Sequence, residues 1–227
     1  MEAASTRPRY TRLAVWTGLV ALIAGLNYYG RFSSAAKSSS AHFSLYSYST
    51  FVGGMITYAV WFGVVLLIAY DRFDLFALRP PRRWGRALGL AAGVIVAVFV
   101  VEAIVSRLPL PQSPGNEQGI LNVHWQPAHA GAFAANVVLL ALVAPVVEEL
   151  TFRGVGQSLL RVLGRAPSIL IVGVAFGLAH GLLEGLLVLV PFGIGLAWLR
   201  DRTESVIPGM LVHALFNGVA LAAAVLT

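Results

Sequence analysis

The segment "VVEELTFRGV", residues 146–155, carries two adjacent carboxylates and an arginine directly after a run of uncharged, mostly apolar residues. Glu149 and Arg153 are spaced i and i+4, so in a helix they share one face and can form an ion pair. Glu148 then points about 100° around the helix axis from Glu149. Adjacent carboxylates in different surroundings can take different chemical roles. We expect Arg153 to pair with Glu149, which leaves Glu148 available for chemistry.

Two later apolar segments also contain polar side chains at helical spacing. "FGLAH" places Phe176 and His180 at i and i+4, and "HALFN" does the same for His213 and Asn217. A single buried histidine is more often a satisfied core residue than a ligand. Two histidines and an asparagine in separate apolar helices would each lack partners in lipid. The sequence therefore predicts that they face the glutamate pair in one polar pocket.

These side-chain types suit hydrolysis. A glutamate can take a proton from water and a neutral histidine can share that water, while a histidine and an asparagine can donate to the oxyanion that forms on an attacked carbonyl. Glutamate and histidine are also zinc ligands, so Glu148, His180 and His213 could instead hold a metal that acidifies the water. The chain has no cysteine, no HExxH and no GxSxG, and no aspartate within an apolar segment. Thiol, helical zinc-protease, serine and paired-aspartate designs therefore do not fit.

The composition identifies a membrane protein. Of the 227 residues, 58% are hydrophobic and 11% are charged, whereas soluble domains carry roughly 25% charged residues. The net charge of +6 does not indicate nucleic-acid binding, because the basic residues are scattered in short segments between apolar runs. We expect a lipid bilayer as the surroundings and no nucleic-acid partner.

The apolar runs predict an all-α, polytopic bundle of about seven transmembrane helices. The runs are long and lack the period-two alternation of strands. The fourth helix is expected to continue as a polar helix to about residue 163, and the fifth and sixth are short. Glycines in "FGIGLAW" and in the seventh segment predict close helix packing. The expected helices cover residues 13–30, 47–70, 85–106, 129–147, 167–182, 186–200 and 205–226.

The basic residues predict the topology. With the N-terminus inside, 13 of the 16 basic residues fall in inside segments, as the positive-inside rule expects. This distribution predicts a multi-pass cell-membrane protein with a cytoplasmic N-terminus, and it places Glu148 at the cytoplasmic end of the fourth helix. We expect the first helix to be an uncleaved anchor, and residues 31–46 and 106–128 to be external loops. The short length and the Arg/Ala/Gly-rich usage favour a prokaryotic source.

Three motifs in this order, EExxxR in "EELTFR", FxxxH in "FGLAH" and HxxxN in "HALFN", resemble those of the CPBP intramembrane proteases. That family includes CAAX-processing endopeptidases and bacterial relatives associated with bacteriocin processing or immunity. The resemblance covers roughly residues 129–226. It divides the chain into N-terminal transmembrane helices with a long external loop, 1–128, and a CPBP-like catalytic helical core, 129–227.

The resemblance implies an intramembrane endopeptidase that hydrolyses a peptide bond near the cytoplasmic membrane surface. It gives Glu148 the role of activating the water, aided by His180. It assigns the oxyanion hole to His213 and Asn217, and a supporting role to Glu149 and Arg153. The partner would be a peptide or protein substrate at or in the membrane. Both metal-dependent and metal-independent mechanisms are described for the family. We favour the metal-independent mechanism, because one glutamate and two histidines have no obvious further metal ligand beside them. A zinc-dependent mechanism is the alternative.

The sequence also allows two alternative functions and contains two further glutamates near apolar segments. The chain could instead be a non-catalytic membrane partner, with an immunity or regulatory role, or a proton-coupled transporter that uses its intramembrane Glu and His. Glu184 follows His180 by four residues, but "GLLEG" indicates a loop. Glu102 is expected to pair within the bundle or to lie near the outer interface. Nothing in the sequence indicates whether a substrate is prenylated, or the oligomeric state.

Overall fold

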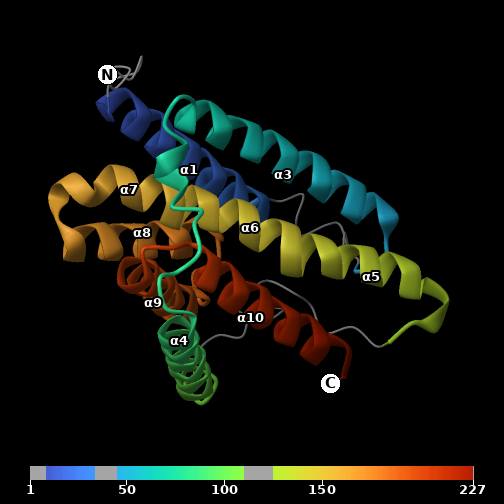
Figure 1. Cartoon of the computed structure of the whole chain (residues 1–227). Helices are drawn as coiled ribbons and strands as arrows, with labels where there is room; N and C mark the ends of the chain where they lie inside the picture. The colour runs from blue at the N-terminus through green and yellow to red at the C-terminus, as the bar shows by residue number, and fades with distance from the viewer. Residues whose placement is uncertain (1–8, 34–44, 110–124, 227) are drawn as a thin grey trace.

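The computed structural model describes residues 9–33, 45–109 and 125–226, and Figure 1 shows that these residues form a bundle of helices joined by turns and loops. Within these ranges there is no strand, which confirms the predicted all-α class. Most of the two predicted external loops, residues 31–46 and 106–128, lies outside the described residues.

The helical segments agree closely with the predicted boundaries. Five of them are long and apolar enough to cross a membrane: α1, α3, α4, the rod Pro127–Leu163 and α10. The remaining two, α8 and α9, correspond to the short fifth and sixth helices; α9 ends in the charged run Arg200–Thr203, which shortens its apolar part. The bounds are α1 Arg9–Phe32, α3 Tyr48–Ala69, α4 Trp84–Val105, α5 Ala130–Val138, α6 Ala144–Glu149, α7 Gln157–Leu160, α8 Arg165–Ala179, α9 Leu186–Thr203 and α10 Ile207–Leu226.

The rod Pro127–Leu163 contains the two adjacent glutamates and is interrupted twice by wider, π-helical turns. These turns cover Leu139–Val143 and Leu150–Gly156, on either side of α6. Pro145 in the first turn of α6 has no N–H to donate to the preceding turn, which favours such a widening. π-Helical turns occur frequently at functional sites. The glutamates therefore lie on a short α-helical stretch between two local distortions.

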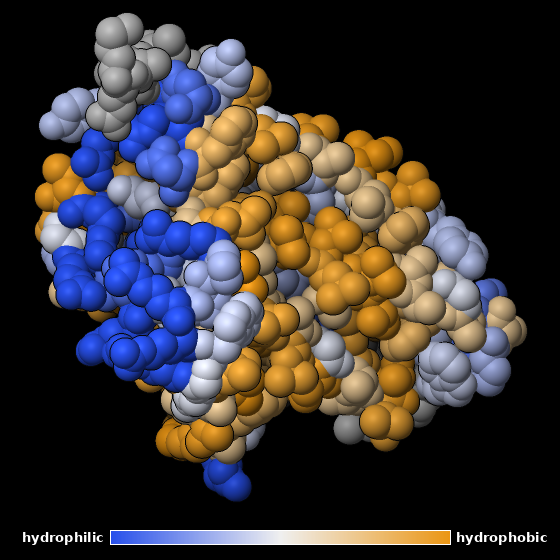
Figure 2. Space-filling view, viewed as in Figure 1, coloured by the Kyte–Doolittle hydropathy of each residue, from blue (hydrophilic) through white to orange (hydrophobic). Residues whose placement is uncertain are grey.

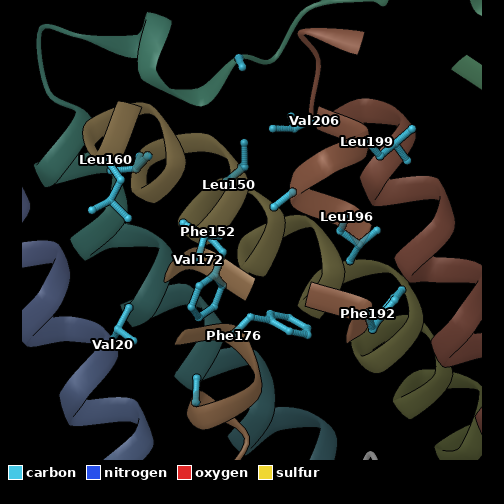
Figure 3. Close-up of a cluster of buried hydrophobic side chains, with 14 of the residues drawn as sticks. Val20, Leu150, Phe152, Leu160, Val172, Phe176, Phe192, Leu196, Leu199 and Val206 are labelled. Atoms are coloured by element: carbon cyan, nitrogen blue, oxygen red, sulfur yellow. The ribbon is translucent and has the colours of Figure 1, made fainter. Parts of the chain in front are cut away.

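The closest helix pair is α8 with α9, which pack through glycines. A Cβ added to Gly193 would lie 2.6 Å from the carbonyl oxygen of Gly173. Because backbone meets backbone at this crossing, neither position has room for a side chain. Gly193 belongs to "FGIGLAW", so the predicted close packing of this segment is confirmed. Figure 3 shows Phe152 of the rod, Phe176 of α8 and Phe192 of α9 meeting in the core beside this pair.

Helix α1 is tied to the rod by polar contacts. The indole Nε1 of Trp16 donates to the carbonyl of Thr151, 2.9 Å away, in the second π-helical turn. Arg9 donates to the carbonyl of Leu159 near the end of the rod. These bonds satisfy carbonyls that helix geometry leaves available. Helix α1 is therefore an integral wall of the bundle in this structure.

The polar side chains gather at the ends of the helices. Figure 2 shows a hydrophilic surface over one end of the molecule and hydrophobic residues over the middle of the bundle. Exposed arginines of the segment between α3 and α4, at the start of α8 and at the end of α9 form the hydrophilic end. This arrangement is that of a helix bundle embedded in a bilayer.

Candidate active site

The Glu149–Arg153 pair lies in the core of the bundle. Both side chains are fully buried, and Arg153 Nη1 donates to Glu149 Oε1 at 2.7 Å. Arg153 Nη2 also donates to the carbonyl of Gly193, 3.0 Å away in α9. The predicted i, i+4 pair therefore forms, and it links the rod to the α8–α9 hairpin. Arg153 is one of the 13 basic residues assigned to inside segments, but its burial shows that it is part of the core instead.

Glu148 points into a different environment from Glu149. Its Oε1 accepts a hydrogen bond of 2.8 Å from the hydroxyl of Tyr58 in α3. Its Oε2 has no hydrogen-bond partner among the described residues. The glutamate is 7% exposed, so this oxygen is nearly shielded from bulk solvent. One carboxylate oxygen is thus held in place while the other is available.

His180 and His213 both turn a ring nitrogen toward Glu148. The Oε2 atom of Glu148 lies 4.0 Å from His180 Nε2 and 3.7 Å from His213 Nε2. These separations are too long for direct hydrogen bonds. Polar groups more than 3.5 Å apart can be bridged by a water molecule. The predicted meeting of the two histidines with the glutamate pair is therefore observed in the structure.

The second nitrogen of each ring has a partner of its own. His180 Nδ1 lies 2.8 Å from the carbonyl of Phe176, so this nitrogen carries the proton and donates. His213 Nδ1 lies 3.2 Å from Glu149 Oε1 and donates to that carboxylate. In the neutral rings, Nε2 is then an acceptor. Both nitrogens face the free oxygen of Glu148, so a water held between them can direct one proton to Oε2 and donate the other to a ring nitrogen.

Phe176 is the packing centre for these polar groups. Its ring lies 4.2 Å below the guanidinium carbon of Arg153, a cation–π contact. The ring also meets His180 and His213, with centroids 4.6 and 5.5 Å apart. Phe176, the phenylalanine of the FxxxH motif, therefore helps to hold the side chains of Arg153 and both histidines in position.

Asn217 lies at the same pocket but is already engaged. Its Nδ2 donates to the carbonyl of Leu140 at 2.9 Å, in the first π-helical turn. An amide nitrogen carries two hydrogens, so one N–H remains available for another acceptor. The structure thus places Asn217 beside His213, as its spacing predicted.

These residues surround one partly open cavity of about 350 Å³. Aromatic rings make up much of the wall. Helices α1 and α3 contribute to it as well as the later helices. The lining comprises Ile23, Asn27, Tyr58, Trp61, Leu140, Ala144, Glu148, Phe152, Phe176, Ala179, His180, Leu189, Phe192, His213, Phe216 and Asn217.

The rod continues beyond the two adjacent glutamates, as predicted. The sequence predicted a helical continuation to about residue 163, and the rod ends at Leu163. About 15 further residues correspond to roughly 20 Å of helix. Almost all residues of this continuation from 150 to 160 are buried among other helices. Glu148 therefore lies well inside the bundle, away from its arginine-rich end.

The predicted zinc ligands do not form a metal site as they are placed. Among the described residues, no group of three His, Cys, Asp or Glu side chains has the spacing to hold a metal ion. Glu148 and the two histidines come near one another, but the two nitrogens are 3.7 and 4.0 Å from the same oxygen. The other oxygen of Glu148 is bound by Tyr58.

Three residues complete the surroundings of the site. Tyr58 was missed by the sequence analysis, although its hydroxyl in the apolar run "MITYAVWF" was a visible signal. Asn27 was also missed; its Nδ2 donates to the carbonyl of Ala179, 2.6 Å away, at the end of α8 next to His180. Glu184 lies in the α8–α9 loop, as predicted, and pairs with Arg31 at 3.3 Å.

The fold and the site together define a polytopic helical membrane protein with a buried glutamate–histidine pocket of the kind used in hydrolysis. Residues 130–219 match the family described as Type II CAAX prenyl endopeptidase Rce1-like. This is the CPBP family that the three motifs predicted, and the match supports a CPBP-type intramembrane protease. No curated protein and no solved structure matches the chain.

Proposed function

We propose that the chain is an intramembrane endopeptidase in which Glu148 activates the attacking water. The observation that carries this proposal is the free Oε2 of Glu148 facing two histidine Nε2 atoms within 4.0 Å. A water held there can give a proton to Oε2 while its oxygen attacks the carbonyl carbon of a peptide bond. The proton then passes to the leaving amine as the C–N bond breaks.

The two histidines have distinct roles in this proposal. His180 Nε2 accepts from the water and orients it, because its Nδ1–H is committed to the Phe176 carbonyl. His213 and Asn217 stabilise the oxyanion of the tetrahedral intermediate. The remaining N–H of Asn217 can donate directly, whereas donation from His213 requires a proton at Nε2.

Glu149 and Arg153 support the site without touching the substrate. Glu149 binds His213 and Arg153 at once, with distances of 3.2 and 2.7 Å from the same oxygen, Oε1. Arg153 is in turn fixed by Phe176 and by the Gly193 carbonyl. This chain of contacts sets the orientation of His213. We propose that residues 129–227 hold the chemistry while helices of residues 1–128 complete the pocket.

The cut is proposed to occur inside the bilayer rather than at its surface. The sequence predicted cleavage near the cytoplasmic surface, but about 15 residues of the rod, roughly 20 Å of helix, separate Glu148 from the arginine-rich end. We place that end, and the N-terminus, on the cytoplasmic side of a prokaryotic cell membrane. The substrate is a peptide or protein segment that reaches this depth.

The proposal can be tested on the purified full-length chain in lipid nanodiscs. A panel of membrane peptides, with and without a prenylated C-terminal cysteine, would be incubated with the wild type, Glu148→Gln and Glu102→Gln. Glu102 lies in α4 and does not line the cavity, so its variant is the matched control. We expect products from the wild type and the control alone. Equal cleavage by Glu148→Gln would overturn the assignment.

A further inference from the structure

Five arginines line a second cavity, far along the bundle from the first. The cavity measures about 470 Å³ and lies where α4 begins, α8 begins and α9 ends. Two carboxylates also line it, Asp201 and Glu204, so the walls carry a net excess of three positive charges. The five arginines are Arg82, Arg83, Arg86, Arg165 and Arg202.

The two carboxylates are already neutralised by neighbouring arginines. Asp201 is buried and forms ion pairs with Arg161 and with Arg165, the latter at 2.8 Å. Glu204 lies 3.6 Å from both Arg79 and Arg82. The two carboxylates therefore do not neutralise the other three arginines of the cavity, Arg83, Arg86 and Arg202.

Arg83 and Arg86 are left without an anionic partner. Both are exposed, and among the described residues neither forms an ion pair. Arg202 stacks on Trp198, with 5.4 Å from its guanidinium carbon to the ring centroid, rather than meeting a carboxylate. Three guanidinium groups of one cavity are thus available to an anion.

The wall behind these arginines is fixed by hydrogen bonds. Ser205 is fully buried and donates its hydroxyl to the carbonyl of Arg79. Arg79 Nε donates to the carbonyl of Glu204 at 2.8 Å. Glu204 itself adopts a left-handed backbone conformation, with φ of 53°. The segment that precedes α4 is therefore hydrogen-bonded to the end of α9. These bonds fix the wall of the cavity that lies between the two segments.

The cavity lies at the level where the apolar surface begins. Trp84 opens α4 directly after Arg83, and Leu88, one turn further on, is 53% exposed. Figure 2 shows the boundary between the hydrophilic end of the molecule and its hydrophobic middle. A ligand held by Arg83 and Arg86 would therefore have apolar helix surface immediately beside it, as a lipid headgroup does when its acyl chains lie along a helix.

We propose that this cavity binds the phosphate headgroup of an anionic phospholipid in the leaflet at the arginine-rich end of the bundle. Guanidinium groups donate paired N–H bonds that match phosphate oxygens, and every basic residue of the cavity is arginine. Basic pockets between helices at the cytoplasmic side are a recognised setting for anionic headgroups. The positive-inside rule accounts for basic residues on this side, but not for their convergence on one cavity. The inference does not depend on the proposed proteolysis.

The test uses the full-length chain in detergent, with bound lipids counted by native mass spectrometry. Phosphatidylglycerol and phosphatidylcholine would be titrated into the wild type, into Arg83→Gln/Arg86→Gln, and into Arg72→Gln/Arg107→Gln. The last pair removes the same charge from exposed arginines outside the cavity. We expect selective binding of phosphatidylglycerol that weakens about fivefold per cavity arginine removed, and a change below about twofold in the control.

Three outcomes would contradict the proposal. The first is unchanged phosphatidylglycerol binding by the cavity variant. The second is equal weakening by the control variant, which would indicate attraction to surface charge in general. The third concerns the source of the phosphate. Inorganic phosphate that displaces the lipid at equal concentration would show a site for soluble anions rather than for a headgroup.

Discussion

The hydroxyl of Tyr58 donates a 2.8 Å hydrogen bond to Oε1 of Glu148. This bond joins α3, in the N-terminal half of the chain, to the glutamate that we propose as the base. It leaves Oε2 as the carboxylate oxygen that faces the histidines. The N-terminal helices therefore take part in positioning the reacting group.

Tyr58→Phe is expected to slow the reaction without unfolding the protein. A hydrogen bond to a charged group contributes about 1.5–3 kcal/mol, so kcat should fall roughly 10- to 100-fold. KM should change little, because the hydroxyl contacts the carboxylate rather than the substrate. Tyr70→Phe, at an exposed tyrosine just after α3, is the matched control. Wild-type kcat in Tyr58→Phe would show that the hydrogen bond does not position Glu148.

Breaking the buried ion pair is expected to destabilise the fold. Arg153→Met leaves the Glu149 carboxylate buried without its partner, at a cost of about 3–5 kcal/mol. The double variant Glu149→Gln/Arg153→Met removes the unpaired charge and should regain part of that loss. Unfolding by heat in detergent would measure both. An Arg153→Met variant as stable as the wild type would contradict the role given to the pair.

The crossing of α8 and α9 should not accept a side chain at Gly193. The added methyl of Gly193→Ala would meet the Gly173 carbonyl oxygen at 2.6 Å, so the two helices must separate. We expect a loss of about 1–3 kcal/mol in unfolding free energy. Gly93→Ala in α4 is the control, because nothing lies within 4 Å of its added Cβ. Equal stability of the two variants would contradict backbone contact at this crossing.

Metal removal is expected to leave the activity intact. The placement of Glu148, His180 and His213 does not match a zinc site, and the proposed steps use a water held by these side chains alone. Wild-type chain dialysed against a strong chelator should retain its cleavage rate. A loss of activity that added zinc restores would show that the site rearranges around a metal, and the mechanism would then have to be revised.

Much of the fold and site could be predicted because each signal was local. Apolar runs of membrane length predicted the helices, and i, i+4 spacing predicted the Glu149–Arg153 pair. The burial of the helix after Glu148 could not be predicted, because it depends on packing that the local sequence does not reveal. The bond from Tyr58 was missed for a related reason. It joins residues 90 positions apart, and no local pattern encodes such a contact.

The most direct test of the central claim is a comparison of protein N-termini in membranes from cells that carry the wild type or Glu148→Gln at matched levels. The isosteric change keeps the shape of the pocket and removes the carboxylate. We predict a set of N-termini present with the wild type and absent with Glu148→Gln, and these would identify the substrate. Identical sets of N-termini in the two membranes would contradict the claim that Glu148 drives proteolysis.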